Sequence, residues 1–277
     1  MIIAVAGGKG GTGKTFVSTS LALVQAPLQF ADCDVEEPNA HLFLEPSLKK
    51  WERVSVTIPS FRKWRGEVCR PGAEFCRFRA LAVVEDEMLV FPELCTSCGG
   101  CFLLCPEETI KPREHQVGVV KMGMAKRGID FVTGELTVGQ QRTEEVIKAV
   151  KKRTSPGENV VIDCPPGSGP TARVALEGAD FCLMVTEPTP FGLHDIQGNK
   201  KLLDVLKIPA GVVINRAGGS YDGIDRWCKK EEIPLLAEIP FDFEIARSAA
   251  RGMTLSEVEP VWEEKLKNLW ADIEKYV

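Results

Sequence analysis

Short apolar runs alternate with helix-like stretches along most of this chain. The run at residues 2–7, IIAVAG, ends in glycines and precedes a helical stretch from Lys14 to about Val24. An apolar run, a glycine-rich turn and an amphipathic stretch predict a buried strand, a loop and a helix. Further strands are expected at 28–31, 160–162, 181–186 and 210–214, and a further helix at 143–152. Strands that alternate with helices predict an α/β fold with a mostly parallel, doubly wound sheet.

The last predicted helix covers residues 260–277 and carries an apolar face. This face comprises Trp262, Leu266, Leu269, Trp270, Ile273 and Val277. The opposite face mixes acidic and basic residues, whereas anionic lipid prefers a basic face. We therefore expect this helix to pack against its own domain, and we expect no stable membrane association.

The alternating pattern is interrupted between residues 51 and 115. This stretch is rich in Pro, Arg and Cys and holds six of the ten cysteines. We interpret residues 51–115 as an inserted domain, and residues 1–50 and 116–277 as one discontinuous domain around it.

Composition narrows the classes of function. The chain is 44% hydrophobic and 26% charged, which is ordinary for a globular protein. The net charge is −5 and the basic residues are scattered, so we expect no nucleic-acid partner. Because no export signal precedes the first strand, we expect a cytoplasmic protein. Ten cysteines in such a protein favour metal ligation or redox chemistry over disulfides.

Residues 8–15, GKGGTGKT, fit the phosphate-loop pattern G-x-x-x-x-G-K-[ST]. Backbone N–H groups of such a loop surround phosphate oxygens, Lys14 supplies a charge and the Thr15 hydroxyl ligates Mg²⁺. A chance match is the alternative, but the loop stands between a predicted strand and a predicted helix. The expected nucleotide-binding residues of this segment are Gly8, Lys9, Gly10, Gly11, Thr12, Gly13, Lys14, Thr15 and Phe16.

An apolar strand with an acidic end is expected at residues 160–167, VVIDCPPG. Asp163 ends the apolar run and precedes a turn, as expected of a Walker B aspartate that holds Mg²⁺ through water. A helix cap is the alternative, but a cap does not need the ProProGly turn that follows.

The cysteines of the insert follow a ferredoxin spacing. Cys95, Cys98, Cys101 and Cys105, followed by Pro106, form the run C-x₂-C-x₂-C-x₃-C-P, whose first three thiolates bind one 4Fe–4S cluster. A structural zinc site remains the alternative, although zinc ribbons favour two separated C-x₂-C pairs.

An incomplete second run lies upstream, at residues 66–80. It keeps Cys69 and Cys76 but has Gly66 and Gly72 at the other two positions. Because fourth cysteines swap between clusters, Cys76 is expected to complete the cluster of Cys95, Cys98 and Cys101. We expect one cluster and not two. Cys69 and Cys105 are then reduced bystanders, ligands of a labile metal or half of a site shared with another subunit; we favour bystanders.

Lys9 makes the loop KGGTGKT, which resembles the deviant Walker A signature of the MinD/ParA superfamily. With the cysteine runs, the chain resembles the members of that superfamily that contain an inserted ferredoxin domain. The resemblance implies a P-loop NTPase fold with a small α+β ferredoxin-like insert. It also implies Mg²⁺-dependent ATP hydrolysis in a dimer, in which Lys9 reaches the partner's phosphates. Lys9 alone could equally be a solvated loop lysine.

The same resemblance assigns further roles. Residues 32–39, DCDVEEPN, are similar to the family's switch I, which gives Asp34 the role of orienting the attacking water and holding Mg²⁺ through water. The implied catalytic residues are therefore Lys9, Lys14, Asp34 and Asp163. Asn215, Pro240 and Asp242 match positions that cradle adenine, although an Asn after a strand is often only a turn residue.

Our leading hypothesis is an ATP-driven dimer switch. A homodimer, or a heterodimer with a paralogue, would close and open so that the cluster-bearing insert engages a metalloprotein or cluster-carrying client during metal or iron–sulfur cluster assembly or delivery. One alternative is an ATP-gated electron donor that resembles the nitrogenase iron protein. Another is a positioning ATPase.

Overall fold

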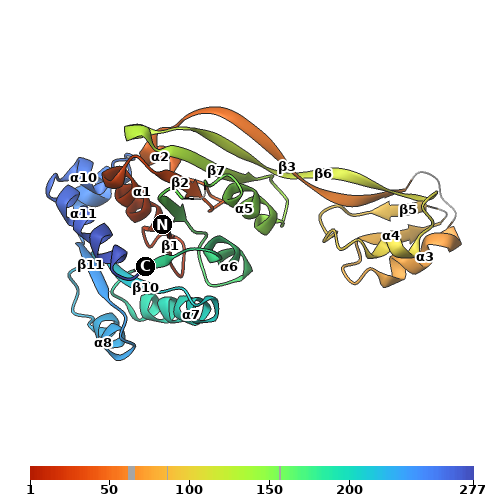
Figure 1. The fold of residues 1–277 in the computed structure, drawn as a ribbon. Coiled ribbons are helices and arrows are strands. Elements are labelled where there is room, and N and C mark those ends of the chain that lie inside the picture. The colour runs from red at the N-terminus through yellow and green to blue at the C-terminus, as the bar shows by residue number, and fades with distance from the viewer. Residues whose placement is uncertain (62–65, 86, 156) are drawn as a thin grey trace. The chain divides into compact units, whose positions relative to one another are not determined.

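The computed structural model describes residues 1–61, 66–85, 87–155 and 157–277 (Figure 1). The chain forms two compact units. The large unit comprises Met1–Glu52, Val120–Glu135 and Thr143–Val277, and the small unit comprises Arg53–Val119 and Leu136–Arg142. The small unit thus lies near the insert expected at 51–115, but it also includes a short later segment.

The large unit is organised around a sheet that has nine strands within the described residues, in the order β11-β10-β9-β1-β8-β2-β7-β6-β3. Its strands are β1 (Ile2–Ala6), β2 (Gln29–Asp32), β3 (Ser47–Phe61), β6 (Ile110–Met124), β7 (Asp130–Leu136), β8 (Val160–Asp163), β9 (Phe181–Thr186), β10 (Ala210–Ala217) and β11 (Leu235–Pro240). The parallel strand pairs are β1–β8, β1–β9, β2–β7, β2–β8, β9–β10 and β10–β11. The predicted mostly parallel α/β sheet is therefore confirmed.

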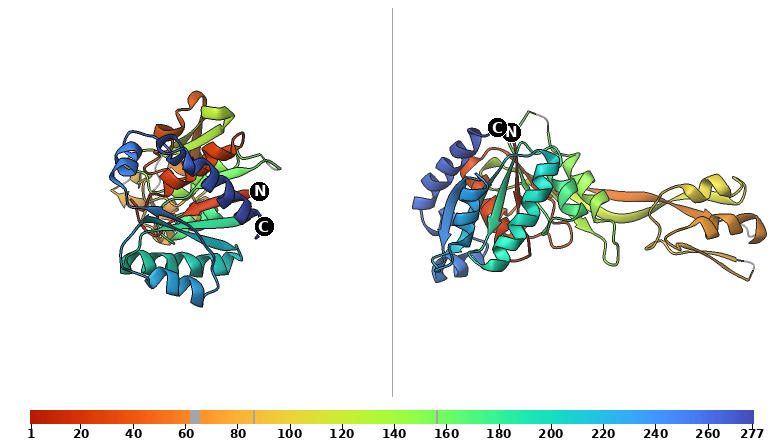
Figure 2. Two further views of the ribbon diagram at one scale, coloured as in Figure 1. Left: turned by 90° about the vertical axis from the view of Figure 1, so that its left-hand side faces the viewer. Right: turned by 90° about the horizontal axis from the view of Figure 1, so that it is seen from below.

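Helices cover both faces of this sheet (Figure 2). They are α1 (Lys14–Gln25), α2 (His41–Leu44), α5 (Thr143–Lys151), α6 (Pro170–Leu176), α7 (Pro190–Leu206), α8 (Gly223–Lys230), α9 (Phe243–Ala249), α10 (Leu255–Val258) and α11 (Val261–Glu274), with a 3-10 turn at Lys126–Gly128. Helix α1 packs with α10 and α11, while α7 packs with α8. Phe30 and Phe131 stack in the core with ring centroids 5.8 Å apart, which locks β2 against β7.

Helix α11 confirms most of the predicted apolar face. Trp262, Leu266, Leu269, Trp270 and Ile273 are all buried in the core that also holds α1. Val277 is the exception and that prediction was wrong, because the helix ends at Glu274 and Val277 is 59% exposed. No helix within the described residues is both long and apolar enough to span a bilayer.

The small unit combines two short helices with a hairpin. Helix α3 (Gly66–Phe75) packs against α4 (Gly100–Leu104) and against strand β4 (Leu81–Val84), which pairs antiparallel with β5 (Glu87–Val90). Strands β7 and β11 of the large unit were not predicted, and neither were β3 and β6. Both β3 and β6 have fifteen residues and contribute residues to each unit, so the division between the units falls inside strands. The first half of β3 is exposed on both faces, which removes the alternation that would reveal a strand.

Candidate functional site

The predicted phosphate loop lies between β1 and α1. Gly11 and Gly13 have φ angles of 83° and 90°, a left-handed conformation that residues with a Cβ rarely adopt. Gly13 also lacks room for a side chain, because a Cβ there would lie 2.3 Å from Asn215 Nδ2. The loop is therefore shaped by its glycines to present the N-terminus of α1, where backbone N–H groups favour an anion.

Two adjoining cavities meet at this loop. The first, of about 390 Å³, brings the loop together with Asp34 and is lined by Gly10, Gly11, Gly13, Lys14, Thr15, Phe16, Asp34, Glu36, Glu37, Asn39, Phe43 and Pro166. The second, of about 270 Å³, is lined by Gly13, Phe16, Asn215, Arg216, Pro240, Phe241, Asp242, Ile245, Ala246, Ala249 and Ala250. Gly13 and Phe16 line both. The residues predicted for phosphate and for adenine thus lie on either side of the start of α1.

The residues predicted to contact adenine also have structural roles. Asn215 Nδ2 donates a hydrogen bond to the Thr12 carbonyl oxygen at 2.8 Å, which ties the loop to the end of β10. The Asp242 carboxylate accepts from the N–H groups of Glu244 at 2.6 Å and Ile245 at 3.2 Å, so it caps α9.

Three acidic residues stand at the neighbouring ends of β2 and β8. Burial is the main cause that raises the pKa of Asp34 to about 6 and that of Asp163 to about 7, while Lys14 lowers both. Burial and the charge of Asp163 also raise the pKa of Asp32. Asp32 accepts hydrogen bonds from the N–H groups of Asp34 and Ala40, each at 3.2 Å. Sequence reasoning missed this role for Asp32, which holds the loop that carries Asp34.

Asp163 has the features of a cation site. Both of its carboxylate oxygens are buried without a hydrogen bond of ordinary geometry among the described residues, although the Thr15 and Ser18 hydroxyls are near enough to lower its pKa. A buried, unpaired carboxylate is costly, and a hard cation with oxygen ligands relieves that cost. Asp163 and the Thr15 hydroxyl therefore fit the Mg²⁺ of a bound nucleotide.

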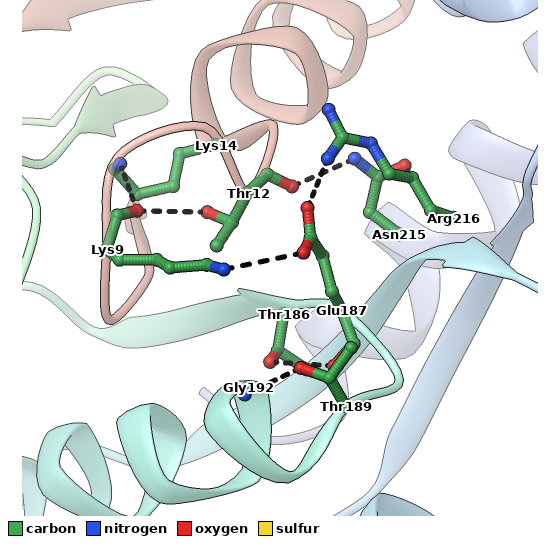
Figure 3. A network of polar contacts seen from close by, with 9 residues as sticks. All are labelled: Lys9, Thr12, Lys14, Thr186, Glu187, Thr189, Gly192, Asn215 and Arg216. Carbon is green, nitrogen blue, oxygen red and sulfur yellow. Dashed lines mark hydrogen bonds and ion pairs between the residues drawn. The ribbon is translucent and has the colours of Figure 1, made fainter. Parts of the chain in front are cut away.

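Lys9 belongs to a polar network at the same loop (Figure 3). Its ammonium lies 3.6 Å from Glu187 Oε2, and the guanidinium of Arg216 forms an ion pair with the other oxygen of Glu187. The Lys9 carbonyl accepts hydrogen bonds from Lys14 Nζ at 3.5 Å and Thr12 Oγ1 at 3.4 Å. Glu187 and Arg216 were not predicted as site residues.

In the small unit, four cysteines line one cavity of about 350 Å³. They are Cys76, Cys95, Cys98 and Cys101, the four predicted to share a cluster, and Phe75, Phe78, Leu81 and Phe102 complete much of the wall. The N–H of Ala80 donates to Cys76 Sγ at 3.3 Å. A hydrogen bond of this kind stabilises a thiolate and tunes an iron–sulfur cluster.

The loop between Cys95 and Cys98 is anchored by Arg142, another residue that sequence reasoning missed. Arg142 Nη1 donates to Ser97 Oγ at 2.7 Å, and Ser97 has a left-handed φ of 57°. The loop ends at Gly99, whose φ of 78° leads into α4.

Cys69 and Cys105 do not line that cavity but are buried behind it, in a small core with Ile110 against which Cys101 and Phe102 of the cavity wall pack. Cys105 Sγ donates to the Cys69 carbonyl oxygen at 3.9 Å, and Cys69 Sγ lies 3.1 Å from Thr109 Oγ1. Burial raises the pKa of Cys105 to about 12, with a further contribution from Cys69. Gly72 is one of the two positions at which the upstream run lacks a cysteine. A Cβ there would lie 2.7 Å from Cys105 Sγ, so the Cys105 side chain fills the space that a cysteine at position 72 would need.

Among the residues that the structure describes, no three His, Cys, Asp or Glu side chains are grouped closely enough to hold a single metal ion.

Comparison with known proteins identifies the family. Residues 3–255 match the CobQ/CobB/MinD/ParA nucleotide binding domain. The chain belongs to this family. The predicted MinD/ParA-like P-loop ATPase fold is thereby confirmed.

Relatives of this MinD/ParA-family chain include two uncharacterized proteins of Methanocaldococcus jannaschii. One is 30% identical over 79% of this chain and 81% of its own length, and the other is 28% identical over 100% and 98%.

Similar folds occur among solved structures. The cell division ATPase MinD of Pyrococcus furiosus matches with a TM-score of 0.58 and 21% identity, over 100% of this chain and 99% of its own. The septum site-determining protein MinD of Pyrococcus horikoshii OT3, complexed with Mg-ADP, matches with a TM-score of 0.57 and 20% identity, over 99% and 96%.

Proposed function

We propose that this MinD/ParA-family protein binds and hydrolyses Mg-ATP to open and close a dimer. In this proposal its small unit carries one 4Fe–4S cluster. The protein acts in metal or iron–sulfur cluster assembly, or in delivery to a metalloprotein client. The observation that carries the proposal is the cavity lined by Cys76, Cys95, Cys98 and Cys101. It lies in a chain that belongs to a family of nucleotide-binding domains.

Different residues of the large unit have different roles in ATP hydrolysis. N–H groups of the phosphate loop and the Lys14 ammonium would hold the phosphates, and Asp163 and Thr15 would hold Mg²⁺, which would neutralise phosphate charge. Asp34 orients a water molecule. The water oxygen attacks the γ-phosphorus, its proton passes to the Asp34 carboxylate, and the bond between the γ-phosphorus and the bridging oxygen breaks to release ADP and phosphate. A pKa near 6 leaves Asp34 largely ionised at neutral pH and able to accept that proton.

The thiol cavity supports a cluster in preference to zinc. A single Zn²⁺ binds sulfur at about 2.3 Å and draws its four ligands to one point. The four cysteines here line a cavity of about 350 Å³. A cavity of that volume leaves room for a guest of several atoms. When bound, the cluster supplies an electron carrier or a source of iron and sulfide.

The surface near this cavity supports a protein client. Phe75 and Phe78 line the cavity and are 59% and 52% exposed, and Cys98 is also exposed. Exposed aromatic side chains are typical of surfaces that dock another protein.

The decisive experiment is anaerobic iron and acid-labile sulfide analysis, with EPR of the dithionite-reduced protein. We expect about four irons per chain in the wild type, most of them lost in Cys76→Ala and retained in the matched variant Cys69→Ala. Zinc without sulfide would overturn the cluster. Incubation with an apo-ferredoxin acceptor then tests delivery, because a cluster that cycles between redox states but never leaves the chain would favour the ATP-gated electron donor.

A further inference from the structure

Lys9, the lysine that distinguishes this phosphate loop, is held by its own chain. Its ammonium lies 3.6 Å from Glu187 Oε2, although the side chain is 48% exposed and could reach outward. The Glu187 side chain is only 13% exposed, so its charge needs compensation.

Glu187 has a second cation available. Arg216 pairs with Glu187 Oε1, so one carboxylate bridges Lys9 and Arg216 (Figure 3). The sheet produces this arrangement, because Thr186 of β9 is in register with Ile214 of β10, so that Glu187, directly after β9, comes close to Arg216, near the end of β10. Arg216 N–H also donates to Asn215 Oδ1 at 3.0 Å, and its φ of 57° fixes an unusual backbone direction.

This double pairing allows Lys9 to leave at low cost. If Lys9 were the sole partner of Glu187, its departure would strand a largely buried carboxylate, which is strongly unfavourable. Because Arg216 stays in place, Glu187 remains compensated when Lys9 moves away.

We infer that Glu187 is a positioning residue for Lys9: it retains the Lys9 ammonium within its own chain until a second, nucleotide-bound copy takes it, and Arg216 sets the strength of that retention. This inference rests on the proposed ATP-dependent dimer. It predicts opposite effects for two substitutions. Glu187→Gln releases Lys9, whereas Arg216→Gln removes the competing cation and tightens the hold on Lys9.

The first test measures Lys9 in the full-length, nucleotide-free chain and does not depend on dimer formation. Acetic anhydride at limiting concentration labels amines, and mass spectrometry compares Lys9 with Lys267 as an internal reference. Partly exposed ion pairs shift equilibria by about 1.4- to 5-fold. We therefore expect Lys9 labelling to rise by up to about fivefold in Glu187→Gln and to fall in Arg216→Gln. Equal labelling in all three proteins overturns the inference.

The second test measures dimerisation by analytical ultracentrifugation with a saturating, non-hydrolysable ATP analogue and Mg²⁺. Two Lys9 side chains are released per dimer, so Glu187→Gln should tighten dimerisation roughly 2- to 30-fold. The same substitution in a Lys9→Ala background should change nothing, since the interaction it removes is already gone. Glu187→Asp, which keeps the charge but shortens the reach, should behave like Glu187→Gln if folding is intact by circular dichroism.

The outcomes separate the two proposals. A wild type that stays monomeric with the analogue overturns the proposed dimer, while the labelling result still decides whether Glu187 retains Lys9. A wild type that dimerises no differently from Glu187→Gln overturns the role of Glu187 and leaves the dimer intact.

Discussion

Two loops of this molecule each end in a left-handed glycine directly before a helix. Gly13, with a φ of 90°, precedes α1, and Gly99, with a φ of 78°, precedes α4. Helix α1 has twelve residues, most of them buried against the sheet, whereas α4 has five residues and none of them is buried. The phosphate loop therefore rests on a large core, but the cysteine loop has little packing beneath it. We expect the first site to be ordered by the fold alone and the second to gain its order from what it binds.

The largest expected effect tests the chemistry of the phosphate site. Asp34→Asn should lower the ATPase rate by about 10²- to 10⁴-fold, because the amide cannot accept the proton of the attacking water. ATP turnover and the affinity for a fluorescent nucleotide analogue would be measured together. Glu37→Gln, at an exposed residue of the same cavity, is the matched control and should stay within about twofold. An equal loss in both variants would contradict the role of Asp34.

The next prediction concerns how the ionised Asp163 carboxylate lowers the stability of the folded chain when no cation is bound. The pKa of Asp163 in the folded chain, about 7, lies above that of an unfolded aspartate. Between about pH 4 and pH 7 the folded chain therefore binds more protons than the unfolded chain, so the contribution of Asp163 to stability declines as the pH rises through that window. The carboxylate faces Asp34, whose charge adds to this cost, and Lys14, which opposes it.

Asp163→Asn should therefore stabilise the nucleotide-free protein at pH 8 by a few kcal/mol, at roughly 1.4 kcal/mol per unit of pKa shift, and have little effect at pH 4. Urea denaturation at several pH values measures this difference. Saturating Mg-ADP should reverse the sign of the stability difference between Asp163→Asn and the wild type at pH 8, because only the wild type holds the cation through its carboxylate. A stability difference that is independent of pH would contradict the explanation that the raised pKa of Asp163 causes it.

A third prediction examines the cysteine loop directly. Removing iron from the reconstituted protein with a chelator should raise the rate of tryptic cleavage at Arg77 and Arg79 by about tenfold or more, because the small unit loses its cross-links. Nucleotide affinity should stay within about twofold, since the large unit keeps its core. Loss of nucleotide binding on chelation would contradict the claim that the phosphate loop, unlike the cysteine loop, is ordered by the fold alone.

The smallest effect separates the two groups of cysteines. Cys69→Ala should lower the free energy of unfolding by about 1 kcal/mol, through loss of a buried side chain, while the iron content stays the same. Thermal melts and iron analysis on the same preparations check both. A loss of iron in this variant would assign Cys69 to a cluster and not to packing.

The sequence predicted the large unit well because its signals are local. The strand, loop and helix around Lys14, and the apolar face of α11, can be recognised from neighbouring residues. Glu187 and Arg216 were missed because each is an ordinary charged residue until the parallel register of β9 and β10 places the two strand ends together. Arg142 was missed for the same reason, since its partner Ser97 lies 45 residues earlier in the chain. Strand β3 was missed because its first half is exposed on both faces and therefore carries no periodic pattern.

The close approach of Ser47 and Gly123 has a consequence for protein engineering. A Cβ at Gly123 would lie 2.1 Å from the Ser47 carbonyl oxygen, so β3 and β6 touch backbone to backbone at this point of the large unit. Two chain segments that meet so closely can be joined by a tight hairpin turn of two residues. The chain between Ser47 and Gly123, which includes all six cysteines of the small unit, could then be replaced by such a turn without stretching what remains.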